Sequence, residues 1–196
     1  MKQYLKIAAT IAIAATASAS AAQDFSGFYI GAGASNSEFE FDDGRGFQLG
    51  MGSVGASLYA GYNYQLAPNF VVGIEAKYDS SDASTFWFPT SIDNLSGVSA
   101  QVGYVIDKVM VYGSIGTKNA TMQPSARPFN LGPPLPSLDE KMTGVSVGAG
   151  VEYFLNDSIS VKGEYTRTDF GLTSGRFFPP SRLTLNSISI GAAVHF

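Results

Sequence analysis

Apolar and polar side chains alternate along most of the chain that follows residue 26. In residues 53–66, every second position from Val54 to Leu66 is apolar or aromatic, and the positions between them are mostly Ser, Gly, Asn and Gln. Strict alternation indicates a β-strand, because successive side chains of a strand point to opposite faces. The pattern predicts eight strands, at about residues 27–41, 53–66, 70–79, 97–106, 109–118, 144–155, 159–170 and 185–196.

Short connections join three pairs of these strands, at residues 67–69, 107–108 and 156–158. Turns at these places put the apolar residues of both strands of a hairpin on one face, whereas a shift of one residue would reverse one strand. They therefore predict cross-strand neighbours, namely Leu66 with Phe70, Tyr62 with Ile74, Ile106 with Val109, Tyr104 with Val111, Tyr153 with Val161, and Glu152 with Lys162.

The other four connections, at about residues 41–52, 80–95, 121–142 and 171–184, are long and rich in Gly, Pro, Ser or Asp. Short turns at one end and long loops at the other are typical of an up-and-down barrel that spans an outer membrane. A soluble barrel would turn its apolar face inward and expose charges. Because the second face is small and polar, we expect the apolar face to contact lipid. The sequence predicts an all-β fold, an eight-stranded antiparallel up-and-down transmembrane β-barrel.

The N-terminal segment has a different pattern. Lys2 and Lys6 are followed by an apolar run at residues 7–15 and then by small residues. This order is typical of a secretory signal peptide, and the run is shorter than the roughly 20 residues that a membrane-spanning helix needs. We expect a signal peptide at residues 1–22, with cleavage after Ala22 or at nearby alanines, and a barrel domain at residues 23–196.

Composition narrows the set of partners. The chain has 12 Lys and Arg, 16 Asp and Glu, and no cysteine. Removal of the two signal-peptide lysines leaves 10 basic against 16 acidic residues, a net charge of −6. Such a surface argues against a nucleic-acid partner. Without cysteine, the exported chain forms neither disulfides nor a thiolate metal site.

Three stretches resemble the small outer-membrane β-barrel family: FSGFYIGAGAS at residues 25–35, GVSVGAGVEYFLNDSISVKGEYTRTDFG at residues 144–171, and SISIGAAVHF at residues 187–196. Members of this family include the opacity-type surface proteins, the OmpA-like transmembrane domain and the Omp25/Omp31-like surface proteins of Gram-negative bacteria. The resemblance implies a place in the cell outer membrane, no cofactor, and roles in envelope integrity and surface contact. It also implies contacts with outer-membrane lipid and lipopolysaccharide, and with periplasmic chaperones and the barrel-assembly machinery during biogenesis.

Few residues suggest catalysis. A site with a nucleophile and a base usually needs a histidine beside Ser or Thr, and the only histidine is His195. We expect His195 to point inward near the periplasmic end as a polar filler. Asp42 and Asp43 lack the spacing of a calcium loop, and the glycine pairs at 31/33 and 148/150 lie inside strands without a phosphate-binding pattern. The sequence predicts no enzyme activity, no cofactor and no metal site.

Charged residues on the inward face form a candidate interior charge network. Its members are Glu75, Lys77, Glu152, Lys162 and Glu164, with Lys118 as a further candidate. Eight strands leave room only for side chains, and an unpaired buried charge is very costly. The network is either a plug of ion pairs that stiffens the barrel or a narrow ion path gated by those pairs, and the size of the barrel favours the plug.

The long loops carry the candidate contact residues, Phe86, Trp87, Phe88 and Arg127. An exposed aromatic cluster predicts either a contact site for a host or surface ligand, or an anchor at the lipopolysaccharide boundary.

The last strand carries an apolar row that ends in an aromatic residue: Ile188, Ile190, Ala192, Val194 and Phe196. This row resembles the C-terminal assembly signal of the family, although Val194 stands where many relatives have an aromatic residue. We expect the last strand to pair with the first, so that no sheet edge stays open.

These features predict a non-enzymatic outer-membrane barrel that contributes to envelope integrity and surface interactions through its long extracellular loops. They leave the oligomeric state open, with a monomer as the expectation. A narrow, porin-like channel of low conductance for small solutes is the alternative.

Overall fold

The computed structural model describes residues 24–42, 48–80, 83–84, 90–124, 140–173 and 181–196. The expected signal peptide and most of the residues between the strands at the far end from the tight turns lie outside these ranges. Within them, no helix is long and apolar enough to cross a bilayer.

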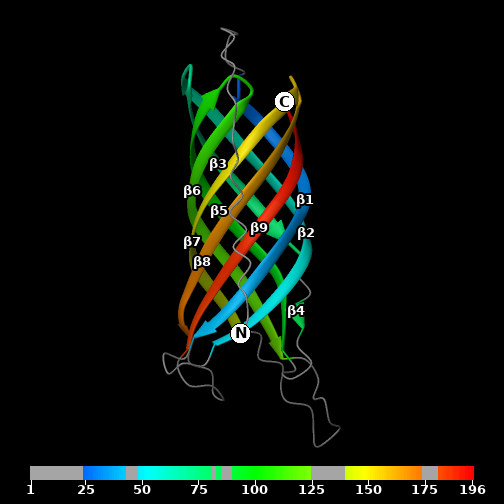
Figure 1. Ribbon diagram of the computed structural model, residues 1–196, viewed down its shortest axis with the longest axis vertical. Coiled ribbons are helices and arrows are strands. Elements are labelled where there is room, and N and C mark those ends of the chain that lie inside the picture. Colours follow the sequence, from blue (N-terminus) through cyan, green and yellow to red (C-terminus); the bar gives the residue numbers. More distant parts are fainter. Residues whose placement is uncertain (1–23, 43–47, 81–82, 85–89, 125–139, 174–180) are drawn as a thin grey trace, which may run out of the picture.

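Eight long antiparallel strands close into a barrel (Figure 1). They are β1 (Gly27–Asp42), β2 (Gln48–Ala67), β3 (Phe70–Asp79), β5 (Thr90–Ile106), β6 (Val109–Pro124), β7 (Glu140–Asn156), β8 (Ile159–Thr173) and β9 (Ser181–His195). A two-residue strand, β4 (Ala83–Ser84), pairs with β5. Each long strand pairs with its neighbours in the chain, and β9 pairs with β1. The predicted eight-stranded up-and-down barrel is confirmed.

The seam between β9 and β1 is a continuous ladder. Ala192 lies opposite Ala32, and the Phe196 N–H donates to the Phe28 carbonyl over 2.9 Å. The two backbones approach so closely at Gly33 that a Cβ there would lie 2.2 Å from the Ile190 carbonyl oxygen. The first and last strands therefore leave no open edge, as predicted.

The three tight turns give nearly the predicted register. Five of the predicted pairs are confirmed: Tyr62 with Ile74, Ile106 with Val109, Tyr104 with Val111, Tyr153 with Val161, and Glu152 with Lys162. The sixth was wrong, because Phe70 pairs with Ala67 rather than with Leu66. The first and third turns have two residues instead of the predicted three, and a β-bulge in each hairpin accommodates the extra residue.

The strands are longer than the sequence pattern indicated. β2 begins at Gln48, β5 at Thr90 and β9 at Ser181, well inside segments predicted to be loops. The backbone ladder continues there, and in β9 the apolar Leu183 and Leu185 are buried whereas Arg182 is exposed. Apolar residues thus lie on the inward face of this stretch, the reverse of the arrangement in the band, so the pattern that marked the strands no longer applies.

The outer wall carries a broad apolar band on the half of the barrel nearest the tight turns. Leu58, Ile74 and Ile190 are each more than 60% exposed. Apolar side chains in the core of a soluble protein would instead be buried. Beyond the band, the outward residues turn polar, with Asn36, Glu38, Ser96, Asn119, Thr143, Arg167 and Asn186 at its margin. Because such barrels have short periplasmic turns and longer extracellular loops, the tight turns mark the periplasmic end.

Candidate functional site

The centre of the barrel holds an ion pair between strands that are not neighbours. Glu75 on β3 accepts a hydrogen bond from the Tyr29 hydroxyl over 2.9 Å, and the same carboxylate oxygen pairs with the Lys162 ammonium of β8. All three side chains are buried. Gln101 adds donor groups, to the Tyr29 hydroxyl at 3.2 Å and to the Asn63 amide oxygen at 2.7 Å. The network thus ties β1, β2, β3, β5 and β8 together across the interior.

Three tyrosine rings surround the Lys162 ammonium. The nitrogen lies 4.2 Å from the centre of the Tyr59 ring, 5.7 Å from that of Tyr29 and 5.9 Å from that of Tyr112. Aromatic faces attract a cation, more strongly where water is excluded. Together with Glu75, the rings stabilise the charge of the buried Lys162 ammonium, which has lost its contact with water.

A second polar group lies on the periplasmic side of this pair. Glu152 accepts a hydrogen bond from the Ser160 hydroxyl over 2.6 Å, and His195 Nε2 lies 3.1 Å from the same Glu152 oxygen and 2.9 Å from Ser160 Oγ. Because an ionised carboxylate only accepts, Nε2 carries the proton in this contact. Ser160 therefore has no basic nitrogen to accept its own proton, as nucleophilic catalysis would need.

Two further ion pairs lie toward the extracellular side. Lys77 contacts Glu164 at 3.4 Å, and Lys118 contacts Asp79 at 3.7 Å. A cavity of about 30 Å³ lies beside Lys77, Lys118 and Glu164, and it is large enough for a water molecule. Acidic and basic groups thus alternate along the interior.

An apolar cluster closes the interior at the periplasmic end. Its members are Phe25, Val71, Val105, Met110, Tyr112 and Phe154. Phe25 precedes β1, is fully buried, and packs edge-on against Phe154 with ring centres 4.6 Å apart. The Phe25 N–H donates to the Gln65 side chain over 3.1 Å. Phe25, which precedes the first strand, therefore forms part of the periplasmic closure.

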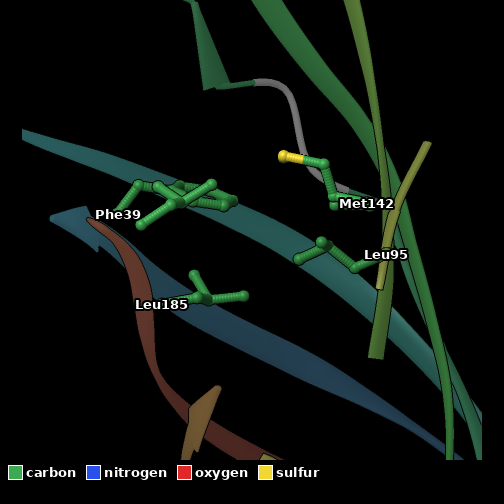
Figure 2. Packing of buried hydrophobic residues seen from close by; sticks show 6 residues of the cluster. Phe39, Leu95, Met142 and Leu185 are labelled. Atoms are coloured by element: carbon green, nitrogen blue, oxygen red, sulfur yellow. The ribbon is translucent and has the colours of Figure 1, made fainter. Parts of the chain in front are cut away.

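A second apolar cluster closes the extracellular side. It consists of Phe39, Leu95, Ala120, Met142, Leu183 and Leu185, with Phe170 packed against it. Figure 2 shows Phe39, Leu95, Met142 and Leu185 converging from different strands. The charged layers therefore lie between two apolar clusters.

One ion pair lies on the outer wall beyond the apolar band. Asp169 on β8 accepts hydrogen bonds from Arg182 of β9, including one from Nε at 3.1 Å, and from the Gly171 N–H at 2.9 Å. The Arg182 hydrogen bond, followed by that of Gly171, holds the pKa of the Asp169 carboxyl below its ordinary value. Asp169 therefore stays ionised to lower pH than a free aspartate.

The structure brings the five residues of the predicted charge network, and Lys118, into the interior. The expected pairing differs in one respect: Glu152 and Lys162 are cross-strand neighbours, but Lys162 pairs with Glu75 and Glu152 with His195. The reason is the length of the lysine side chain, which reaches across the narrow barrel. His195 points inward at the periplasmic end, with a side chain 6% exposed.

The apolar row of the last strand faces outward, and its members Ile188, Ile190, Ala192, Val194 and Phe196 are all exposed. The loop residues Phe86, Trp87, Phe88 and Arg127 lie outside the described residues.

Sequence reasoning missed the tyrosines around Lys162 and both apolar clusters. Tyr29, Tyr59 and Phe39 stand at inward positions of their strands, so alternation alone placed them inside. Their packing partners, however, come from strands far apart in the sequence. Within the described ranges, no group of three or more histidine or acidic side chains is arranged to hold a metal ion.

Relatives with known names are outer-membrane proteins. The 31 kDa outer-membrane immunogenic protein of Brucella melitensis is 27% identical over 158 residues, which cover 71% of this chain and 65% of that protein. The chain thus matches slightly less than two thirds of the Brucella relative. The 22 kDa outer membrane protein of Rhizobium leguminosarum bv. viciae is 29% identical over 188 residues, 89% of this chain and 80% of the relative.

Solved structures support the fold. Ail, the attachment invasion locus protein of Yersinia pestis, aligns with a TM-score of 0.59 at 16% identity, covering 87% of this chain and 99% of Ail. Neisserial surface protein A aligns with a TM-score of 0.55 at 16% identity, covering 87% of this chain and 98% of that protein.

The model of the outer membrane protein beta-barrel domain family matches residues 7–196. The closed barrel, its apolar outer band and the named relatives agree with this match, and place the protein in the outer membrane. The chain belongs to the outer membrane protein beta-barrel domain family.

Proposed function

We propose that this protein is a closed, non-enzymatic barrel that contributes to envelope integrity and presents its extracellular loops for surface interactions. The observation that carries the proposal is the filled interior, in which ion-paired layers lie between the two apolar clusters. An open conduit would need a continuous polar path, and apolar constrictions oppose the passage of hydrated ions.

Two observations favour a non-enzymatic role. Ser160, whose hydroxyl contacts His195, is completely buried and donates its proton to Glu152. The apolar residues Phe25 and Phe154 lie over this group at the periplasmic end. A substrate therefore has no route to the only histidine of the chain.

Recordings from the full chain in planar lipid bilayers test the proposal. A closed barrel should give only small, intermittent conductance. A steady, large, porin-like conductance would contradict it. The paired substitutions Glu75→Gln and Lys162→Met supply a matched variant with both central charges removed. If the alternative of a narrow gated ion path were right, this variant would change the conductance steps or ion selectivity. In a closed barrel it should change neither.

The envelope role has its own test in cells. A strain that lacks the protein should leak more of a periplasmic marker enzyme than its parent, and the intact gene should restore retention. A variant that lacks residues 85–89 and 125–139 separates the two parts of the proposal. It should restore retention of the marker enzyme because the barrel remains, but it should lose the surface interactions that the loops are proposed to make. Equal leakage with and without the protein would contradict the envelope role.

A further inference from the structure

One edge of β2 has no partner strand near its extracellular end. β2 pairs with β1 from Gln48 to Asn63. On its other side it pairs with β3 only from Ser57 onward, because β3 ends at Asp79. The short strand β4, which follows β3 in the chain, pairs with β5 instead. Among the described residues, no strand therefore pairs with this side of β2 before Ser57.

Ser80 ends the hydrogen bonding between β2 and the chain of β3. Its N–H donates to the Ala56 carbonyl over 2.8 Å, and its hydroxyl oxygen accepts the Ala56 N–H over 3.3 Å. Successive residues of an antiparallel strand direct their N–H and C=O groups to opposite sides. Since those of Ala56 point away from β1, so do those of every second residue before it. These residues, which present backbone donors and acceptors at the open edge, are Gln48, Gly50, Gly52 and Val54.

The sequence of this stretch does not protect the edge. Natural sheets block open edges with charges, proline or bulges, whereas residues 48–55, QLGMGSVG, contain neither a charge nor a proline. Their register with β1 is continuous, so they contain no bulge. Gly50 and Gly52 add no side chain to the outer face, and a Cβ at Gly52 would meet nothing within 4 Å. An added strand therefore meets no side chain of β2 at these two positions.

Two carboxylates lie beside these glycines on the outer wall. Glu38 is the cross-strand neighbour of Gly52, and Glu40 is that of Gly50. Both glutamates are exposed, and neither forms an ion pair with any described residue. Neighbouring strands lie about 4.8 Å apart, so a long basic side chain on an added strand can reach across a glycine to either carboxylate. The chain's own segment 80–89, which follows β3, contains no Lys or Arg and does not complement this charge.

The cations of the neighbouring strands leave the two carboxylates unneutralised. Arg182 on β9 pairs with Asp169 of β8, and its cross-strand neighbour on β1 is a further acid, Asp42. Arg167 on β8 is separated from Glu38 by the whole of β9. The extracellular end of β1 thus carries an excess of negative charge next to the open edge of β2.

We propose that the edge of β2 from Gln48 to Val54 binds an extended, basic segment of a partner protein as an additional antiparallel strand. The inference rests on the proposed role in surface interactions, and it names the mode of binding and the class of partner. Backbone hydrogen bonds to an open edge supply affinity, and side chains at alternate positions supply specificity. Lysine or arginine at every second position of the added strand lies over the two glycines and pairs with Glu38 and Glu40.

Binding of a fluorescent synthetic peptide to the full chain, folded in a zwitterionic detergent, tests this edge. The probe alternates lysine with threonine. In an antiparallel addition, the lysines opposite Gly50 and Gly52 exchange backbone hydrogen bonds with them, whereas the threonine N–H groups point away from β2. Methylation of the lysine backbone nitrogens keeps the charge of the probe but should weaken binding roughly tenfold. Methylation of the threonine backbone nitrogens is the matched control and should leave binding unchanged.

Variants of the chain test the same site from the other side. Glu38→Gln combined with Glu40→Gln should weaken binding of the probe roughly three- to tenfold. Gly52→Lys places a competing cation beside Glu38, in the open space over the strand, and should weaken binding to a similar extent. Asp107→Asn combined with Asp157→Asn removes two charges at the periplasmic turns and should bind the probe as the parent protein does. Gel mobility with and without heating checks that each variant is folded.

Three outcomes would overturn the proposal. If the probe methylated on its lysine nitrogens binds as tightly as the unmodified probe, the peptide is held by charge alone and not as a strand. If the parent and the variant without Glu38 and Glu40 bind the probe equally, the carboxylates do not select a basic partner. If the chain forms dimers without the probe, and Gly52→Lys abolishes them, the occupant of the edge is a second copy. None of these outcomes affects the bilayer recordings or the retention of the periplasmic marker, so the proposed function would stand.

Discussion

At the scale of single residues, the interior is filled by placing large side chains opposite glycines. Tyr29 lies opposite Gly61, and Gly31 lies opposite Tyr59. Tyr112 likewise lies opposite Gly150. A barrel of eight strands is so narrow that a ring projecting from one strand must lie over the backbone of the next. Gly31, Gly61 and Gly150 are therefore required by packing, because each leaves the space that the ring of the opposite tyrosine occupies.

Gly31→Val should destabilise the barrel. A Cβ at Gly31 would lie 2.3 Å from atoms of the Tyr59 ring, so the ring would have to leave its place near Lys162. Overpacking of this kind costs about 1–3 kcal/mol. Urea unfolding in detergent micelles measures the loss. Gly52→Val is the matched control, because Gly52 has nothing within 4 Å of its added Cβ. Equal stability of the two variants would show that the packing argument is wrong.

The central ion pair makes a second prediction at this scale. Glu75→Gln leaves the Lys162 ammonium buried without its acidic partner, and breaking a buried pair in this way costs about 3–5 kcal/mol. Adding Lys162→Met removes the orphaned charge and should recover most of the lost free energy of unfolding. Urea unfolding of the single and double variants tests this. A double variant less stable than Glu75→Gln alone would mean that Lys162 stabilises the barrel chiefly through the tyrosine rings.

At the scale of the strand, the seam between β1 and β9 joins the two edges of the sheet. The Phe196 backbone is tied to Phe28, whereas its side chain is 78% exposed on the outer wall. An exposed ring contributes little to packing within the barrel. Its place at the end of an outward apolar row fits recognition during insertion better than a role in the folded core.

Deletion of Phe196 should reduce the amount of protein in the outer membrane. The expected cause is slower assembly, since the C-terminal row would lose its aromatic end. Immunoblots of outer-membrane fractions, with and without heating before electrophoresis, measure the folded yield. Phe196→Ala should reproduce the defect. Tyr104→Ala removes a comparably placed exposed ring, at the periplasmic end of β5, and should leave the yield unchanged. A normal yield for the Phe196 deletion would refute the assignment.

The strands also show how far sequence alone could lead. Alternation predicted all eight long strands and five of six cross-strand pairs, because the outward side chains of the band must be apolar. It gave the wrong partner, Leu66, for Phe70. A two-residue turn with a β-bulge and a three-residue turn without one leave the same apolar residues on the outer face, so alternation does not distinguish them. It also underestimated the lengths of β2 and β5, which begin at Gln48 and Thr90, because the apolar-outward pattern of the band does not extend that far.

At the scale of the whole molecule, the barrel interior is organised in layers. Inward residues of β8 alone pass from Ser160 through Lys162 and Glu164 to Thr168, and the apolar clusters lie beyond each end. Alternation placed the charges inside, but their partners could not be predicted. Lys162 and Glu75 are 87 residues apart, and their contact depends on closure and on the tilt of the strands. The closure proposed above therefore depends on contacts between strands that are far apart in the sequence.

Phe25 precedes β1 and packs against Phe154 at the periplasmic end, from outside the sheet. Phe25→Ala should admit water and small reagents to the group that contains His195. Since the chain has a single histidine, the carbethoxyhistidine formed by diethylpyrocarbonate reports on this site alone, and its rate of formation should rise severalfold. Phe28→Ala removes the same ring three residues away, on the lipid-facing wall, where it is 67% exposed. That control should leave the rate unchanged. Equal rates in the parent and Phe25→Ala would show that Phe154 and its neighbours close the mouth without help from the N-terminal segment.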